Sequence, residues 1–524
     1  MFMKGNRMKT GNPSNAVRLI REPLLFLFLS LILTTHILAQ NAAIDLNVTH
    51  QRIRGFGAAN ILPWRPDMTD SEIETAFGTE EGQLGFTILR LMIEPNRNNW
   101  NLNVRTARKA HDMGVLLFAS PWNAPSDILE TVDGLRRVRH DRYEDYAYHL
   151  DDFRIFMEDQ GVPIYAISVQ NEPDYGDWTR WTADEMLTFM RDYAPIIGTR
   201  VMAPESFQFR REMSDPILND SLACANLDIV GGHIYGGGLR SYPLAESKEK
   251  EVWMTEHLSG ENSHSNVWSW AIQVGTEINS VMHAGMNAYV WWYIVRYYGP
   301  ISDGTNDSGR KGEVTKKGYV MSQFSRFIRP GYYRIECPRL LQRSVWGSAY
   351  KDSTSSRVVI VAINTVSEPK KQSFVFLNGH VEKFTPHVTS QTKDCSREND
   401  IIVSNDSLHV MLDGNSITTF VSSGDVILSV ERAATGPASY QLSQNHPNPF
   451  NASTRIQFET PERTFVSLKV YNILGHVVDE LAGKEFSAGT HSVTFDASHL
   501  SSGIYFYAFK TKDYTQTQKM FLIR

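Results

Sequence analysis

The sequence predicts an α/β protein, in which a (β/α)8 TIM barrel carries an attached all-β side domain and is followed by a small C-terminal β-sandwich. Between residues 55 and 326, short β-branched runs alternate with longer amphipathic stretches, which is typical of βα units and a parallel sheet. Two apolar runs, residues 167–173 (ISVQNEP) and 252–257 (VWMTEH), each reach a glutamate. Barrel strands deliver catalytic carboxylates at their carboxyl tips in this way. After residue 331 the chain changes to alternating strands punctuated by Ser, Asn and Gly, which predicts the all-β part.

The predicted barrel has eight strands, each short and rich in β-branched or aromatic residues. They are expected near residues 55–60, 87–93, 115–120, 164–170, 200–204, 229–235, 252–256 and 288–293. Polar or aromatic side chains lie at several strand ends, among them Arg90, His233 and Trp292. Because active sites of such barrels lie at the carboxyl ends of the strands, we expect these side chains to line one.

The segments outside the barrel have simpler patterns. Residues 41–54 are expected to add a strand to the side domain at residues 327–425, so that the barrel and the side domain pack as one rigid unit. Residues 426–439 are interpreted as a linker, and residues 440–524 predict the small β-sandwich. Aromatic residues of this last segment alternate as core residues do, which disfavours a carbohydrate-binding module with an exposed aromatic face.

The N-terminus has the pattern of a secretory signal peptide, residues 1–40. Five basic residues precede an apolar run at residues 24–33, and a small residue, Ala39, precedes a plausible cleavage site. An uncleaved membrane anchor is the alternative, but the run is shorter than the roughly 20 residues of a bilayer span. No other segment is apolar enough to cross, so we expect no stable membrane span after processing.

Composition disfavours several classes of function, among them nucleic-acid binding and metal binding. A net charge of −6 gives no electrostatic footprint for nucleic acid or an anionic membrane, so an uncharged polymer suits this chain better as a substrate. The three cysteines, Cys224, Cys337 and Cys395, have no metal-type spacing and can form at most one disulfide. No cofactor motif is present, so we expect no cofactor and no metal. We also expect a monomer.

The two glutamates at the strand tips, Glu172 and Glu256, indicate glycoside cleavage. They are far enough apart in the chain to fit strands four and seven of the barrel. The chemistry needs one carboxylic acid to protonate the leaving oxygen and one carboxylate to meet the oxocarbenium-like carbon, about 5 Å apart if configuration is retained. Most glutamates are merely surface charges. That alternative is weakened because Asn171, which can hydrogen-bond a sugar 2-hydroxyl, immediately precedes Glu172.

Residues 43–421 resemble the bacterial xylanases of glycoside hydrolase family 30, in the glucuronoxylanase subgroup. The matching stretches are RGFG (54–57), ASPWNAP (119–125), AISVQNEPDY (166–175), VMAPES (201–206), WMTE (253–256), YVWWY (289–293) and FIRPG (327–331). This resemblance implies a barrel with a β side domain, a retaining mechanism and no metal in catalysis. It also implies that Glu172 is the general acid/base and that Glu256 is the nucleophile. The reaction requires Glu256 to stay ionised, and we expect Arg90 or a hydrogen-bonding tyrosine to hold it so.

Glucuronoxylanases of this family select xylan that bears a glucuronic acid side group. The resemblance implies that Arg296 binds the uronate carboxylate, with Trp292 and Tyr298 at companion positions. Without the resemblance, a structural salt bridge is the better interpretation of such an arginine. The chain departs from the family at Leu258, where a tyrosine that also touches the uronate is common, and leucine cannot donate a hydrogen bond.

Three further aromatic residues, Trp122, Trp178 and Tyr235, are candidates for stacking on sugar rings, with core packing as the equally plausible alternative. The C-terminal segment resembles the type A sorting domains of the type IX secretion system, with NPFN at 448–451 and SGIY at 502–505. This resemblance implies export across the outer membrane, with the secretion machinery as a partner. The resemblance to family 30 implies xylan as the substrate.

Two alternatives to a glucuronoxylan endo-β-1,4-xylanase remain. One is a uronate-independent endo- or exo-xylanase of the same family, which Leu258 favours because fold and catalytic pair do not fix specificity. The other is an inactive xylan-binding protein, which the presence of both carboxylates disfavours.

Overall fold

The computed structural model describes residues 40–523 except 177, 261–262 and 429–438. Apart from Gln40, the predicted signal peptide lies outside the described residues, as does most of the predicted linker. Within the described part of the chain, no helix is both long and apolar enough to cross a bilayer. The three cysteines are all free.

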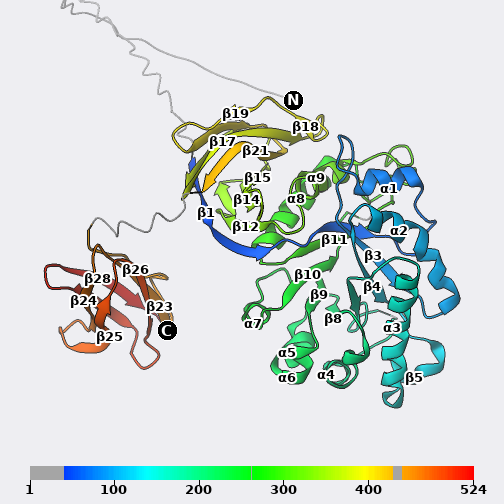
Figure 1. Ribbon diagram of the computed structural model, residues 1–524, viewed down its shortest axis with the longest axis horizontal. Coiled ribbons are helices and arrows are strands. Elements are labelled where there is room, and N and C mark those ends of the chain that lie inside the picture. Colours follow the sequence, from blue (N-terminus) through cyan, green and yellow to red (C-terminus); the bar gives the residue numbers. More distant parts are fainter. Residues whose placement is uncertain (1–39, 177, 261–262, 429–438, 524) are drawn as a thin grey trace, which may run out of the picture. The chain divides into compact units, whose positions relative to one another are not determined.

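Eight parallel strands close into a barrel in the order β10-β11-β2-β3-β4-β7-β8-β9 (Figure 1). They are β2 (Gly55–Ala59), β3 (Ile88–Ile93), β4 (Leu116–Pro121), β7 (Ala166–Ser168), β8 (Arg200–Ser206), β9 (Ile229–His233), β10 (Glu251–Glu256) and β11 (Ala288–Tyr293). Each overlaps a strand predicted from the sequence, and the predicted barrel is confirmed.

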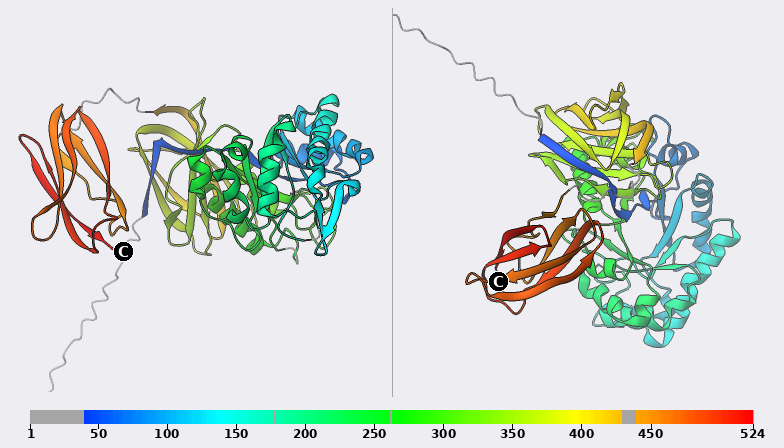
Figure 2. Two further views of the ribbon diagram at one scale, coloured as in Figure 1. Left: turned by 90° about the horizontal axis from the view of Figure 1, so that it is seen from below. Right: turned by 60° about the vertical axis from the view of Figure 1, so that its left-hand side comes forward.

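Helices surround the outside of the barrel (Figures 1 and 2). They are α1 (Asp70–Phe77), α2 (Val104–Asp112), α3 (Tyr143–Asp159), α4 (Ala183–Asp192), α5 (Arg211–Asn219), α6 (Ser221–Ala225), α7 (Pro243–Ser247), α8 (Trp268–His283) and α9 (Lys316–Ser325). Local sequence fixes some of their starts. Thr69 and Glu72 form a reciprocal capping box at α1, which satisfies backbone N–H groups that a helix otherwise leaves unpaired. A short hairpin of β5 (Leu129–Val132) and β6 (Leu135–Val138) precedes α3.

Alternation along the barrel strands produces two apolar layers. Ile88, Phe118, Met202 and Trp253 belong to a buried cluster that strand residues form among themselves inside the barrel. Neighbouring residues in the same strands pack outward, in one cluster with the helices. Arg90 lies two residues after Ile88, so it shares the inward face and is completely buried. A buried guanidinium therefore lies at the carboxyl end of the barrel interior.

The side domain is an 11-stranded sheet to which the N-terminal strand β1 (Gln40–Arg52) belongs. Its other strands are β12 (Tyr333–Glu336), β13 (Leu340–Gln342), β14 (Val345–Lys351), β15 (Val358–Asn364), β16 (Lys370–Leu377), β17 (Gly379–Thr389), β18 (Ser396–Arg397), β19 (Ile401–Ile402), β20 (Ser407–Leu412) and β21 (Ser416–Leu428). β1, blue in Figure 2, pairs antiparallel with β12 and parallel with β16.

Strand β15 joins the side domain to the barrel. Val359, Val361 and Ile363 belong to the core that includes the barrel helices, whereas Val358 and Ile360 belong to the core of the side domain itself. All seven residues of the strand are buried. Because both faces of β15 are covered, the barrel and the side domain share apolar packing that neither part could supply alone.

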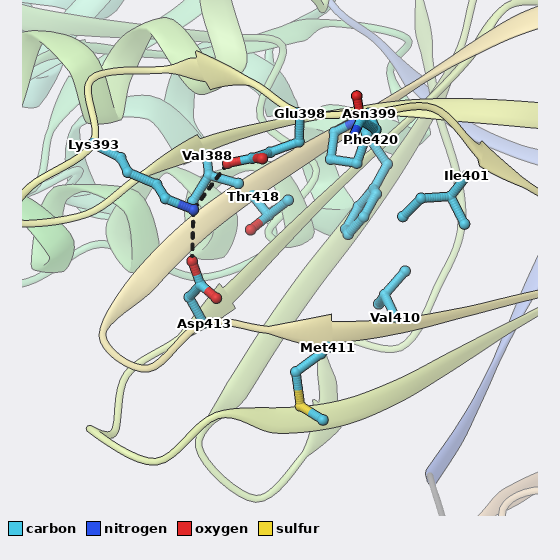
Figure 3. Close-up of a pocket in the computed structure, with 11 residues that line it drawn as sticks. Val388, Lys393, Glu398, Asn399, Ile401, Val410, Met411, Asp413, Thr418 and Phe420 are labelled. Carbon is cyan, nitrogen blue, oxygen red and sulfur yellow. Dashed lines mark hydrogen bonds and ion pairs between the residues drawn. The ribbon is translucent and has the colours of Figure 1, made fainter.

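The side domain also contains a cavity of about 300 Å³ (Figure 3). At its rim, Nζ of Lys393 lies 2.9 Å from Oε1 of Glu398 and 3.0 Å from Oδ2 of Asp413. Phe420 and Val388 contribute apolar lining. The charged groups already pair with one another, so the cavity leaves no free charge for a ligand.

The C-terminal segment forms two packed antiparallel sheets around its own core. One has β22 (Gln441–Leu442), β23 (Ser453–Thr460) and β26 (Gly489–Asp496), and the other has β24 (Thr464–Tyr471), β25 (Val477–Phe486), β27 (Gly503–Lys510) and β28 (Thr515–Leu522). Ile456, Phe458 and Tyr507 are among its fully buried residues. The predicted small β-sandwich is confirmed.

Candidate active site

An irregularity at the end of β10 directs Glu256 into the barrel mouth. Met254 pairs with Gly232 of β9, but the next pair is Glu256 with His233, so β10 contains one extra residue there. Regular alternation after the inward-facing Trp253 would turn residue 256 outward. A bulge of this kind re-aims the following side chain. Glu256 is consequently 5% exposed and faces the interior charges.

A similar irregularity at β8 accounts for Glu205. Pro204 pairs with Gly231 and Ser206 with Gly232, which leaves Glu205 unpaired with β9 at a φ of +60°. Few non-glycine residues adopt that left-handed backbone, and those that do so often lie at functional sites. The side chain of Glu205 is fully buried beside Arg90 and His233.

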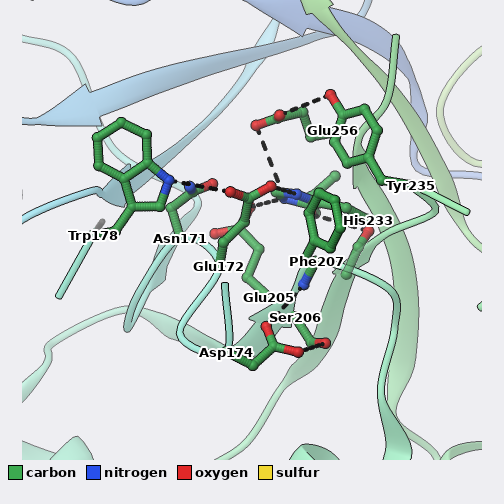
Figure 4. A network of polar contacts seen from close by, with 12 residues as sticks. Asn171, Glu172, Asp174, Trp178, Glu205, Ser206, Phe207, His233, Tyr235 and Glu256 are labelled. Atoms are coloured by element: carbon green, nitrogen blue, oxygen red, sulfur yellow. Dashed lines mark hydrogen bonds and ion pairs between the residues drawn. The ribbon is translucent and has the colours of Figure 1, made fainter. Parts of the chain in front are cut away.

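Glu172 lies beyond β7, held by a backbone hydrogen bond to the end of β8. Its φ is +46°, and its backbone N–H donates to the carbonyl of Glu205 at 3.1 Å. The indole N–H of Trp178 donates to Oε2 of Glu172 at 3.1 Å (Figure 4). On the other side, Nδ1 of His233 lies 3.0 Å from Oε1 of Glu172. The carboxyl group of Glu172 is thus fixed from two directions.

Arg90 connects the groups at the centre of the site. Its guanidinium donates to Glu256, donates to Oδ1 of Asn171 at 2.5 Å, and forms an ion pair of 2.9 Å with Glu205. Because arginine can only donate, this contact fixes the Asn171 amide with its oxygen toward Arg90. Nδ2 of Asn171 is buried and has no hydrogen-bond partner among the described residues. It is therefore a donor that the described residues leave unpaired.

His233 is surrounded by carboxylates. Its Nε2 lies 3.7 Å from Glu205 and 4.0 Å from Glu256. Burial lowers the pKa of His233, but the carboxylates of Glu256, Glu172 and Glu205 outweigh it and raise the pKa to about 9. Burial by itself would raise the pKa of Glu205, yet Arg90 and His233 lower it to about 2. Arg90, His233 and Glu205 are therefore charged at neutral pH.

Burial and neighbouring charges have opposite effects on the pKa of Glu256. Burial raises the pKa of its carboxyl above the usual value, while the charges of His233 and Arg90 act to lower it. The hydroxyl of Tyr235 donates to Oε1 of Glu256 at 3.0 Å, and Arg90 donates to the other oxygen. Arginine and a tyrosine, the two kinds of group expected to hold this carboxylate, both contact it. They favour its ionised form.

The two strand-tip glutamates lie close to one another. One carboxylate oxygen of Glu172, one of Glu256 and a ring nitrogen of His233 all lie within 4.8 Å of one another. These atoms are of the types that ligate metals. However, the guanidinium of Arg90 and the raised pKa of His233 already place positive charge at the same carboxylates, which disfavours a cation there. An approach of the two carboxylates to within 4.8 Å is compatible with two carboxyl groups that act on one glycosidic carbon with retention.

Tryptophans cover one side of the carboxylates. Trp64 stacks on Trp178 with ring centroids 5.6 Å apart and meets Trp122 edge-on at 5.4 Å and Trp292 at 6.5 Å. Trp122 is 2% exposed, and the Cζ atom of Arg90 lies 4.6 Å from its ring centre. Its ring therefore lines the site but exposes little surface for stacking on a sugar. Trp64, with 38% of its surface exposed, is the most accessible of the four.

A second aromatic group lies on the side of Tyr235. Tyr235 stacks on Phe207 at 5.2 Å, and Phe207 stacks on Tyr175 at 3.7 Å with nearly parallel rings. Phe207 is held by its backbone N–H, which donates to Asp174 at 3.0 Å (Figure 4). Tyr175 is 47% exposed, so this stack reaches from the buried nucleophile candidate to the surface.

Arg296 lies in the segment after β11. Its Nη1 forms an ion pair of 3.0 Å with Asp303, and its Cζ lies 5.7 Å from the ring centre of Tyr298. The salt bridge considered from the sequence is thus present. However, Nε of Arg296 is buried without a hydrogen-bond partner among the described residues, which leaves one donor unused. Leu258 and Trp292 pack against the apolar cluster to which Tyr298 belongs.

Sequence reasoning identified the centre of this site but not its full extent. Arg90 and His233 were expected at strand ends, whereas Glu205, Trp64 and Phe207 were assigned no role. Glu205 carried the same signal as the two recognised acids, because it also ends an apolar strand run, VMAPE. Trp64 and Phe207 lie in loops, where no periodicity marks them.

A closed (β/α)8 barrel in which oxygens of two carboxyl groups approach to within 4.8 Å at the carboxyl end, flanked by aromatic rings, is the arrangement of a glycoside hydrolase. The chain is 42% identical over 396 residues to the glucuronoxylanase XynC of Bacillus subtilis, which covers 73% of this chain and 92% of that protein. The chain belongs to glycoside hydrolase family 30, as do two solved xylanases to which it is 39% and 35% identical.

Solved structures agree with this assignment. A family 30 endoxylanase from Clostridium papyrosolvens is 39% identical, with a TM-score of 0.68, and covers 73% of this chain and 100% of its own. The family 30 subfamily 8 xylanase Xyn30A from Clostridium acetobutylicum is 35% identical, with a TM-score of 0.67. The match covers 74% of this chain and 100% of that xylanase. Residues 445–523 match the model of the secretion system C-terminal sorting domain.

Proposed function

We propose that this chain is a secreted, retaining endo-β-1,4-xylanase that cleaves glucuronoxylan. The observation that carries the proposal is the approach of the Glu172 and Glu256 carboxylate oxygens to within 4.8 Å, at the carboxyl end of the barrel. This spacing suits direct attack by one carboxylate, and it leaves too little room for the water that an inverting enzyme places between its two carboxyl groups.

In the first step Glu172 donates its proton to the glycosidic oxygen, and an oxygen of Glu256 attacks the anomeric carbon. The carbon–oxygen bond to the leaving chain breaks, and a glycosyl–Glu256 ester forms. In the second step Glu172 accepts a proton from water, which attacks the same carbon and releases Glu256. Asn171 donates through its free Nδ2 to the sugar 2-hydroxyl, a contact that strengthens in the transition state.

Arg90 contacts two of the groups that act in this reaction, Glu256 and Asn171. It stabilises the Glu256 carboxylate before attack, and it orients the Asn171 amide. Tyr235 donates to the other oxygen of Glu256. These preorganised donors are effective because the site is buried, where electrostatic interactions are stronger than in water.

Glucuronic acid recognition is assigned to Arg296, with Trp292 and Tyr298 beside it. Arg296 supports this assignment because Asp303 pairs with its Nη1 and its Nε is left without a partner among the described residues, so the guanidinium has donor capacity beyond that ion pair. The xylanase named as a relative from Bacillus subtilis is a glucuronoxylanase, which points the same way. A uronate-independent xylanase is the second candidate, and the apolar Leu258 favours it.

The C-terminal sandwich is assigned to export. The match of residues 445–523 to a secretion system sorting domain supports passage to the cell surface or the medium by type IX secretion. Xylan is too large to import intact, so an enzyme that cuts it is useful only outside the cell. We further propose that the enzyme acts as a monomer.

Covalent trapping and product analysis test the proposal together. A 2-deoxy-2-fluoroxylobioside that bears the glucuronic acid side group and a good leaving group should label the peptide that contains Glu256, as identified by mass spectrometry. Products from glucuronoxylan should each carry one glucuronic acid at a fixed position, with little action on xylan that lacks uronate. Label on another residue would contradict the nucleophile assignment. Similar unsubstituted oligomers from both polymers would keep the catalytic pair but favour the second candidate.

A further inference from the structure

The loop after β2 and the segment after β11 lie next to each other at the carboxyl end of the barrel. β2 and β11 are paired neighbours, with Ala59 opposite Tyr293. The hydroxyl of Tyr293 donates to the carbonyl of Ile61 at 3.4 Å, so the contact continues beyond the strands. Residues just after β2 are therefore close to the Arg296 segment.

Arg65 extends from this loop toward the tyrosines. It is exposed, and its Cζ lies 6.0 Å from the ring centre of Tyr293. It takes part in no ion pair within the described ranges. Asp67, an acid nearby in sequence, is occupied by Arg105 at 3.1 Å and accepts from Asn60 at 3.0 Å. Arg65 is thus an unneutralised cation beside the candidate site.

Arg296 approaches the same tyrosine surface from the other segment. Its Cζ lies 4.9 Å from the ring centre of Tyr297 and 5.7 Å from that of Tyr298. Tyr293 and Tyr298 belong to one buried cluster. Burial raises the pKa of Tyr298, and the charges of Arg296 and Arg65 both act against that rise. Two guanidinium groups therefore flank one pair of tyrosines.

The local charge balance suits a single carboxylate. Burial would raise the pKa of Asp303, but hydrogen bonds from Thr305 and the charge of Arg296 lower it, so Asp303 is ionised at neutral pH. Arg65, Arg296 and Asp303 together carry one net positive charge. Leu258 packs against the Tyr298 cluster and can offer a substrate carboxylate no hydrogen bond.

We propose that Arg65 is a specificity-determining residue that binds the glucuronic acid carboxylate together with Arg296. The inference rests on the proposed function, because it assumes that a uronate occupies the surface beside Tyr298. Arginine suits the role, since its planar fork can donate to the same carboxylate that the proposed function assigns to Arg296. Arg65 supplies from the loop after β2 a second charged contact for the uronate, at a site where Leu258 supplies none.

The test compares two substrates that differ only at the carboxylate. One is glucuronoxylan, and the other is the same polymer after chemical reduction of its uronic acids to neutral sugars. The selectivity is the ratio of kcat/KM on the first to kcat/KM on the second. We expect Arg65→Ala to lower this ratio about fivefold, between the effect of an exposed ion pair and that of a desolvated charged hydrogen bond.

Matched variants separate charge from other effects. Arg240 is also exposed, in the loop after β9, so Arg240→Ala should leave the ratio unchanged. Arg65→Lys should retain part of the selectivity because the positive charge remains. The loss in Arg65→Ala should shrink in 1 M salt, where the screening length is about 3 Å. Thermal unfolding of each variant checks that the fold is intact.

The outcomes distinguish this inference from the function on which it rests. A wild-type ratio near one would overturn uronate selection, and the role of Arg65 with it. A high wild-type ratio that Arg65→Ala leaves unchanged would overturn only the role of Arg65. An equal loss of activity on both substrates would likewise overturn it, because the arginine would then act on the xylan backbone or the loop.

Discussion

Glu205 offers a quantitative test of the charge network beneath the candidate active site. Its carboxylate is fully buried, 2.9 Å from Nη2 of Arg90 and 3.7 Å from Nε2 of His233. Replacement by glutamine keeps the shape but removes the charge, so two buried cations lose a counter-ion. Removal of one member of a buried ion pair typically costs about 3–5 kcal/mol.

The shifted pKa of Glu205 gives an independent value for the free energy that its charge contributes to stability. A fall from the ordinary value of 4.5 to about 2 corresponds to about 3 kcal/mol at about 1.4 kcal/mol per unit. Because the folded pKa is depressed, this stabilisation is fully present above pH 4.5 and is lost as the pH falls toward 2. We therefore expect Glu205→Gln to lower the free energy of unfolding by about 3 kcal/mol at pH 7, with a difference from wild type that narrows below pH 4.5.

Urea unfolding followed by tryptophan fluorescence measures this difference. All 11 tryptophans lie between Trp64 and Trp346, so the signal reports the barrel and side domain without the C-terminal sandwich. Glu212→Gln, a change at an exposed glutamate of α5, should shift stability by less than about 0.5 kcal/mol. Equal stability of Glu205→Gln and wild type at pH 7 would refute the reasoning. If the difference in free energy of unfolding between the variant and wild type stays constant down to pH 3, the effect comes from packing and not from charge.

The remaining predictions concern the reaction. Glu256→Gln should reduce xylan hydrolysis about a thousandfold or more with folding intact, as measured by reducing-sugar release, and substantial residual turnover would exclude the nucleophile role. Glu172→Ala should lose about 10²- to 10⁴-fold on glucuronoxylan but much less on an aryl xylobioside that bears glucuronic acid, whose leaving group needs no proton. Equal losses on both substrates would argue against an acid/base role. Arg296→Ala should lower the preference for glucuronoxylan over uronate-free xylan about tenfold, while Arg310→Ala, a change at a side chain that is 90% exposed, should not. An unchanged preference in Arg296→Ala would make that arginine purely a partner of Asp303.

The barrel could be predicted because its signal is local. Each strand is a short buried run, and the eight runs recur with amphipathic stretches between them, so pattern alone places them. Glu172 and Glu256 were found for the same reason, since each ends such a run. The small C-terminal sandwich follows from strands whose buried and exposed residues alternate, as in β23. Resemblance to family 30 added the expected roles of these residues, which no pattern of hydrophobicity could supply.

The side chains around the two glutamates depended on the tertiary structure. The extra residues in β8 and β10 reverse the alternation just before Glu205 and Glu256, and a period of two read from the sequence would direct both carboxylates away from the barrel interior. Trp64, Phe207 and Arg65 lie in loops with no period at all, and their meaning comes from neighbours that are distant in the chain. By itself the sequence determined which strands form the barrel and which two acids end them, because burial has a local signature. Closure of the barrel decided the partners and charge states of those acids, because Arg90, His233 and Glu205 come from separate strands and interact only once the eight strands meet.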